Sequence, residues 1–147
     1  LAKRPEQFRL AVSLHAADPQ ERGRLMPIQR KYPLEEVLKA AAPFRRRLTF
    51  EYVLIAGRND ADTDADRLAK LAHRLGAHVN LLPLHPGGSP GLSPSSGNRI
   101  RAFAERLRNQ GVEAVVRKSR GLDIDAACGQ LSVVVESKRR RATLETT

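Results

Sequence analysis

The stretch from residue 48 to residue 83, LTFEYVLIAGRNDADTDADRLAKLAHRLGAHVNLLP, decides the fold class. Its first seven residues are rich in β-branched and aromatic side chains, which is typical of a buried strand. The apolar positions that repeat at helical spacing after a polar turn are Leu68, Leu71, Ala72 and Leu75. Asp62 or Thr63 can cap this helix and Gly76 can end it. Because residues 78–83 again read as a strand, the stretch predicts a strand, a helix and a second strand.

The same alternation continues on both sides of this unit. The other expected elements are a strand at residues 8–14, a helix at residues 34–44, a loop at residues 85–96, a helix that Ser95 or Ser96 caps and Gly111 ends, and a strand at residues 112–117. Strands that alternate with helices indicate an α/β fold with a parallel sheet.

Composition narrows the class of function. The chain has 147 residues, enough for one domain, and 26 Lys and Arg against 16 Asp and Glu give it a formal charge of +10. Such an excess favours a polyanionic partner such as nucleic acid. Aromatic residues make up only 4% and Trp is absent, which disfavours a base-stacking surface.

One cysteine, Cys128, excludes an internal disulfide and a cysteine-based metal site contained in this chain. No apolar stretch approaches the roughly 18 residues of a membrane span, so we expect no membrane association and a cytoplasmic location. Because the chain begins with Leu1 close to a predicted strand, we also expect it to be the later part of a longer protein.

Polar residues follow the expected strands at their carboxyl ends, where the loops of a parallel sheet gather and carry chemistry. These residues are Ser13, His15, Asn59, Asp60, His85, Arg117, Lys118, Arg120, Asp123, Asp125 and Cys128. At the opposite edge we expect no mixed constellation, and the runs at residues 45–47 and 138–141 are interpreted as solvated charge or non-specific phosphate contacts.

Each candidate also has a structural interpretation. By spacing alone, Ser13 and His15 fit strand-end groups that the backbone satisfies, and His85 fits an ordinary loop histidine. Cys128 is either a small buried hydrophobe or a reactive thiolate favoured by its glycine-flanked loop and the basic residues before it.

Six segments together carry a family resemblance. They are residues 13–16 (SLHA), 25–28 (LMPI), 50–54 (FEYVL), 79–83 (VNLLP), 117–121 (RKSRG) and 123–131 (DIDAACGQL). In this order they resemble the C-terminal half of the radical S-adenosylmethionine (SAM) RNA methyltransferases of the RlmN/Cfr type. The resemblance runs from about residue 8 to residue 131, and the last segment is the most specific.

The resemblance implies a fold and a set of site residues. It implies the C-terminal portion of a partial (β/α) barrel at residues 1–136, followed by a basic tail at residues 137–147. The residues implied to contact SAM are Ser13, Leu14, His15 and His85, and His85 stands where the family usually has Asn. Cys128 matches the cysteine that carries a methyl group. The three cysteines that bind the family's [4Fe-4S] cluster lie upstream, so no metal ligands are expected in this chain.

The reaction implied is transfer of a methyl-derived carbon from SAM to an adenine of 23S ribosomal RNA, with transfer RNA as a second substrate. In the family it proceeds through a methylcysteine and a 5'-deoxyadenosyl radical, and an electron donor reduces the cluster. Arg117, Lys118 and Arg120 are expected to contact RNA phosphates, and the protein is expected to be a monomer. Leu122 replaces a common acidic residue. The alternatives are a non-catalytic basic RNA-binding module of the same fold and a phosphate-binding metabolic enzyme.

Overall fold

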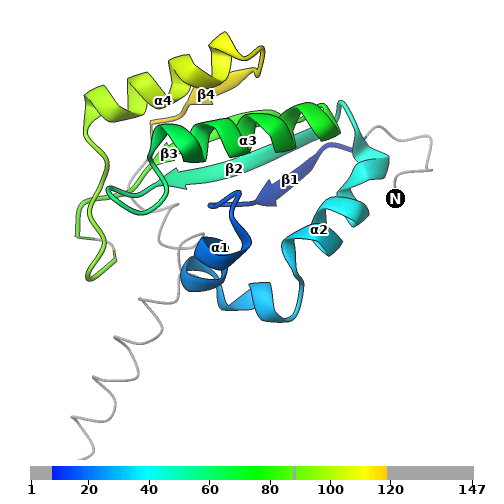
Figure 1. The fold of residues 1–147 in the computed structure, drawn as a ribbon, viewed down its shortest axis with the longest axis horizontal. Coiled ribbons are helices and arrows are strands. Elements are labelled where there is room, and N and C mark those ends of the chain that lie inside the picture. The colour runs from blue at the N-terminus through cyan, green and yellow to red at the C-terminus, as the bar shows by residue number, and fades with distance from the viewer. Residues whose placement is uncertain (1–7, 88, 119–147) are drawn as a thin grey trace, which may run out of the picture.

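Four parallel strands alternate with helices in the computed structural model, which describes residues 8–87 and 89–118 (Figure 1). The elements are β1 (Leu10–Ser13), α1 (Pro19–Leu25), the 3-10 turn η1 (Pro27–Arg30), α2 (Leu34–Ala41), the 3-10 turn η2 (Ala42–Phe44), β2 (Leu48–Leu54), α3 (Asp62–Leu75), β3 (His78–Pro83), α4 (Gly97–Asn109) and β4 (Ala114–Val116). The strands are hydrogen-bonded in the order β1-β2-β3-β4. The predicted α/β class with a parallel sheet is confirmed.

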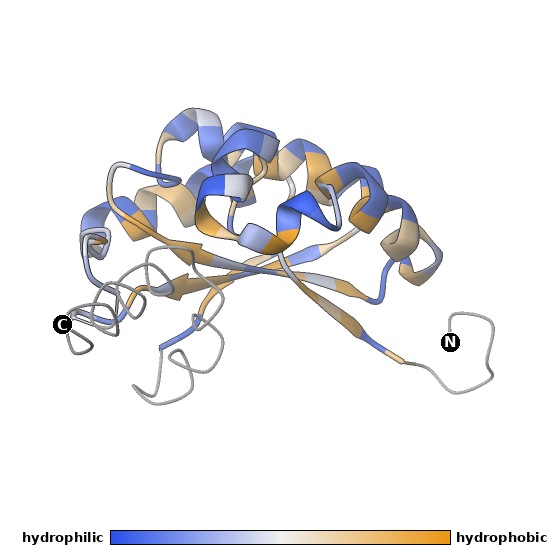
Figure 2. Cartoon of the chain, turned by 90° about the horizontal axis from the view of Figure 1, so that it is seen from below, coloured by the Kyte–Doolittle hydropathy of each residue, from blue (hydrophilic) through white to orange (hydrophobic). Residues whose placement is uncertain are grey.

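The main core lies between the sheet and the helices, which gather on one side of it (Figure 2). One layer of this core runs across the strands in register, from Val12 to Phe50, Val79 and Ala114. Phe50 and Val79 are fully buried, and Tyr52 of β2 packs against Phe103 of α4 with ring centroids 5.6 Å apart. Alternate residues of each strand therefore pack against the helices.

The other side of the sheet lies away from these helices. Side chains that the strand alternation directs there are Ala11, Ser13, Thr49, Glu51, His78, Asn80 and Val115, all exposed or half-buried. We call this surface the open face. At the carboxyl ends of the strands, Val53 and Ile55 cover this face together with loop residues that include Leu84 and Leu92, as a second apolar cluster.

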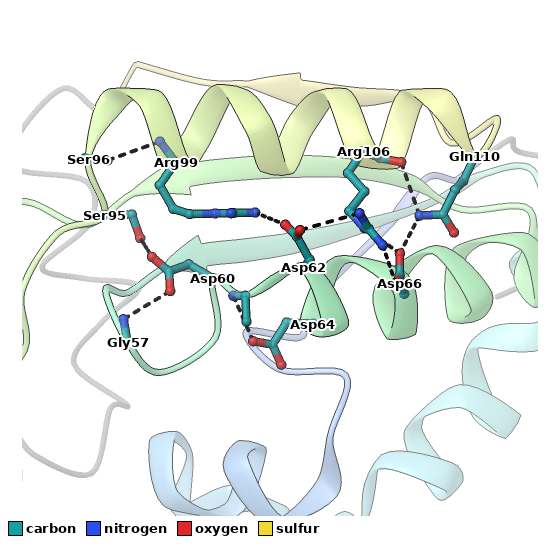
Figure 3. A network of polar contacts seen from close by, with 11 residues as sticks. Gly57, Asp60, Asp62, Asp64, Asp66, Ser95, Ser96, Arg99, Arg106 and Gln110 are labelled. Atoms are coloured by element: carbon teal, nitrogen blue, oxygen red, sulfur yellow. Dashed lines mark hydrogen bonds and ion pairs between the residues drawn. The ribbon is translucent and has the colours of Figure 1, made fainter.

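Helices α3 and α4 are joined on their outer side by ion pairs (Figure 3). Arg106 makes two bonds to Asp66, from Nε at 2.8 Å and from Nη2 at 2.9 Å, and Arg99 pairs with Asp62. The hydrogen bond from Arg106 lowers the pKa of Asp66 to about 2. Because these groups are exposed, we expect them to orient the helices more than to stabilise them.

Helix α1 was not predicted, and residues 42–44 continue α2 as a 3-10 turn rather than an α-helix. The signal for α1 was present, because Asp18 precedes Pro19 at the first helical position. The Asp18 carboxylate accepts the backbone N–H groups of Gln20 and Glu21 at 2.8 and 2.9 Å. The first and last strands are also shorter than the predicted ranges 8–14 and 112–117.

The helix ends follow the predicted residues in part. Neither Asp62 nor Thr63 caps α3, because the helix begins at Asp62 after Ala61; instead Asp64 accepts the Ala61 N–H at 3.0 Å. Gly76 ends α3 in a left-handed conformation with a φ of 60°, as predicted. Of the two serines proposed for α4, Ser96 is the cap and accepts the Arg99 N–H at 3.1 Å.

Within the described part of the chain, no helix is both long enough and apolar enough to span a bilayer.

Candidate functional site

The turn after β1 is organised by His15, one of the residues expected to contact SAM. His15 is 3% exposed and adopts a left-handed backbone conformation with a φ of 55°. Its Nδ1 accepts the backbone N–H of Val53 at 3.0 Å. Burial, and secondarily the charge of Arg22, lowers the pKa of His15 to about 4. The imidazole is therefore neutral near pH 7, as its acceptor role requires.

A fully buried amide, that of Asn59, ties this turn to the carboxyl end of β2. The Asn59 Nδ2 donates to the carbonyl of His15 at 2.7 Å and to that of Val53 at 2.6 Å, while Oδ1 accepts the Ile55 N–H at 2.7 Å. Tyr52 donates its hydroxyl proton to the Asn59 carbonyl at 2.8 Å. Asn59 thus saturates backbone groups that the ending strands leave without partners.

The loop after β3 is held to the same edge through Asp60. The buried carboxylate of Asp60 accepts hydrogen bonds from Ser95 Oγ at 2.7 Å and from the Gly57 N–H at 3.0 Å (Figure 3). A further backbone bond joins the Ala56 N–H to the Ser93 carbonyl at 2.9 Å. The carboxyl-terminal loops of β1, β2 and β3 therefore form one hydrogen-bonded edge, as the polar residues there predicted.

The residues expected to contact SAM differ in what they present to a ligand. Ser13 is exposed on the open face and His85 is exposed in the loop after β3, whereas Leu14 is fully buried in the main core. The side chain of His15 is engaged with Val53, which supports its structural interpretation. Ser89, in the same loop as His85, has a buried hydroxyl without a hydrogen-bond partner among the described residues.

The other predicted site residues are only partly covered by the structure. Arg117 and Lys118 follow β4 and are exposed, and the Arg117 N–H bonds to the Leu81 carbonyl at 2.9 Å. Arg120 and Cys128 lie outside the described residues, so their roles stay predictions, as does the boundary between residues 136 and 137. Residues 8–87 and 89–118 contain no group of three or more His, Cys, Asp or Glu placed to hold a metal.

One expectation about the opposite edge is wrong. A cavity of about 350 Å³ opens toward the amino-terminal half of the strands. It is lined by Arg9, Arg46, Arg47, Thr49, His78, Val79, Asn80, Glu113, Val115 and Arg117. Parallel pairing brings the entry ends of the strands side by side, and Arg117 joins them because β4 is only three residues long. The arginine run at residues 45–47 did not by itself predict this cavity.

Curated relatives match nearly the whole chain. A protein of Gemmatimonas aurantiaca named probable dual-specificity RNA methyltransferase RlmN is 59% identical over 131 residues, which is 89% of this chain and 36% of the relative. The dual-specificity RNA methyltransferase RlmN of Sorangium cellulosum is 48% identical over 92% of this chain and 36% of its own length. The chain thus spans little more than a third of these relatives. No protein-family model matches it.

Comparison with solved structures points to the same kind of protein as the sequence relatives. A radical SAM methyltransferase from Sphaerobacter thermophilus is 47% identical, with a TM-score of 0.75 over 90% of this chain and 40% of that protein. A domain of the pyruvate-formate lyase-activating enzyme from Bacteroides vulgatus, 22% identical with a TM-score of 0.56 over 74% of this chain and 66% of that one, shares the fold. By sequence and by fold, the chain is homologous to the C-terminal part of the RlmN family of RNA methyltransferases.

Proposed function

We propose that the longer protein to which this segment corresponds is a radical SAM RNA methyltransferase that modifies an adenine of 23S ribosomal RNA, with transfer RNA as a second substrate. The observation that carries this proposal is the 59% identity to an RlmN protein over 89% of the chain. This longer protein acts as a monomer and receives electrons from a separate donor.

The carboxyl-terminal edge of the sheet fits SAM. The exposed Ser13 hydroxyl and His85 imidazole are available for hydrogen bonds, and the unpartnered Ser89 hydroxyl is a buried polar atom of the kind that a bound ligand satisfies. SAM, when bound, supplies the methyl group. The described residues do not fit a [4Fe-4S] cluster, whose thiolate ligands they lack, and its ligands belong to another part of the longer protein.

The described residues hold the backbone of this edge in place, and they do not carry the methyl group themselves. His15 and Asn59 hold the turn that follows Ser13, so that the serine hydroxyl is presented from a rigid backbone. Cys128 would carry the transferred methyl group as a thioether, by its match to the family's cysteine. Arg117, Lys118 and Arg120 would bind RNA phosphates beside it.

The proposal is tested with the full-length protein, reconstituted with iron and sulfide. Incubation with SAM should add one methyl group to Cys128, detected by peptide mass spectrometry, and Cys128→Ala should abolish methyl transfer to RNA. Ser13→Ala should weaken SAM binding in equilibrium dialysis, while Ser93→Ala, an exposed serine in the loop after β3, should not. An intact cluster with no methylated cysteine would instead favour the non-catalytic RNA-binding module.

A further inference from the structure

Four arginines that come from different strand ends line one cavity on the open face. Arg9 precedes β1, Arg46 and Arg47 precede β2, and Arg117 follows β4. Thr49 and Asn80, which add neutral polar side chains, line the same cavity of about 350 Å³. This volume is at the lower end of the range for small-ligand sites, so the cavity can take a phosphate and its sugar.

The charge of this cavity is not balanced by the described part of the chain. Its one acidic lining residue, Glu113, pairs with His78 at 3.0 Å. Among residues 8–87 and 89–118, Arg9, Arg46, Arg47 and Arg117 form no ion pair; Arg47 donates to the Phe8 carbonyl at 3.4 Å. By contrast, five arginines elsewhere are paired with carboxylates: Arg58 with Glu21, Arg67 with Asp64, Arg74 with Glu35, Arg99 with Asp62 and Arg106 with Asp66. Among the described residues, the four cavity arginines therefore lack the carboxylate partners that these five have.

The turn that supplies two of these arginines is also strained. Arg46 has a φ of 67°, a left-handed conformation that costs a non-glycine residue about 1 kcal/mol. Backbone bonds on either side hold it, from the Arg45 N–H to Ala42 at 3.1 Å and from the Arg47 N–H to Phe44 at 2.8 Å. An anion in the cavity would gain a favourable interaction with these cations.

We propose that the arginines at the strand-entry end of this cavity, Arg9, Arg46 and Arg47, bind a phosphodiester of the RNA, in addition to the contact already assigned to Arg117. Guanidinium groups bind phosphate oxygens through paired N–H donors, and several cations without counterions favour a multiply charged strand over a single carboxylate. At about 3.3 Å per residue, Arg47 lies about 26 Å along the chain from Ile55, at the other end of β2. RNA held there would be anchored away from the reacting base. This inference rests on the proposed function for RNA as the ligand.

The experiment compares two neighbouring arginines with a third in the same run. Binding of a fluorescein-labelled 20-nucleotide single-stranded RNA to the full-length protein, without SAM, is measured by anisotropy across a series of KCl concentrations. Arg46→Gln/Arg47→Gln should lower the slope of log K against log salt by about 1.4, since each lost phosphate contact on a single strand removes about 0.7. The control is Arg45→Gln, which removes an exposed charge of the same turn that does not line the cavity and should leave the slope unchanged.

A further variant, Arg9→Gln, alters the cavity without touching the strained turn or Arg117 and should lower the slope by about 0.7. Circular dichroism melting checks that each variant is folded. Slopes for Arg46→Gln/Arg47→Gln and for Arg9→Gln that equal the slope for Arg45→Gln would overturn the proposal, as would binding of polyglutamate in preference to the RNA. The assay measures RNA binding and not methyl transfer. Its result therefore stays interpretable even if the protein proves to have no methyltransferase activity.

Discussion

Protonation of His15 should unfold the turn after β1, and the size of the effect follows from its surroundings. The Nδ1 of His15 accepts the Val53 N–H, so a proton on that nitrogen replaces a hydrogen bond by a clash of two donors. Burial first, and the positive charge of Arg22 second, lower the pKa from its ordinary value of 6.5 to about 4. The unfolded chain therefore binds a proton at a higher pH than the folded chain. The contribution of His15 to the free energy of unfolding is therefore present in full above pH 6.5 and is lost as the pH falls toward 4.

The magnitude is the free energy of that pKa difference. Between the ordinary value of 6.5 and about 4, it amounts to about 3 kcal/mol in total, of which about 2 kcal/mol is lost between pH 7 and pH 5. Burial raises the pKa of Asp64, but that carboxyl contributes equally to any two variants that share it.

The assay is urea unfolding at pH 7, 6 and 5, followed by circular dichroism, for the wild type and for His15→Asn. Asparagine tolerates the left-handed backbone and offers an oxygen near the position of Nδ1, yet it does not titrate. The wild type should lose about 2 kcal/mol more than His15→Asn between pH 7 and pH 5. Parallel losses in the two proteins would refute the neutral, hydrogen-bonded histidine.

Three further predictions, on Asn59, Gly76 and Ser96, are tested by the same unfolding assay. Asn59→Ala should destabilise the chain by about 3 kcal/mol, because three buried backbone groups lose their partner, and a loss below about 1 kcal/mol would contradict the role given to this amide. Gly76→Ala should cost about 1 kcal/mol through its φ of 60°, whereas Gly23→Ala inside α1 should stabilise by about 0.5 kcal/mol; equal effects would argue against strain. Ser96→Ala should cost about 1 kcal/mol by removing the α4 cap, an effect that Ser96→Asp should restore.

The burial of the residues in β2 shows how much of the fold the local sequence pattern predicted. Residues 48–54 alternate so that Leu48, Phe50, Tyr52 and Leu54 are buried, and this period, with the Gly76 stop, was enough to predict the parallel α/β class. The polar residues after the strands likewise predicted the carboxyl-terminal edge, because parallel strands must place those ends together. Helix caps were predicted less well, since several nearby polar residues compete for each helix end, as Asp62 and Asp64 do.

By itself, the sequence determined the fold class, the order of the elements and the family resemblance, because these depend on local periodicity and on residue identity. Only the tertiary structure decided that His15 turns inward to accept the Val53 N–H while Ser13 remains exposed, a choice made by strand register and a left-handed backbone. It also decided that Arg9, Arg46 and Arg117 share one cavity. Electrostatic partners across a sheet are set by distances between strands, and no spacing along the chain encodes those distances.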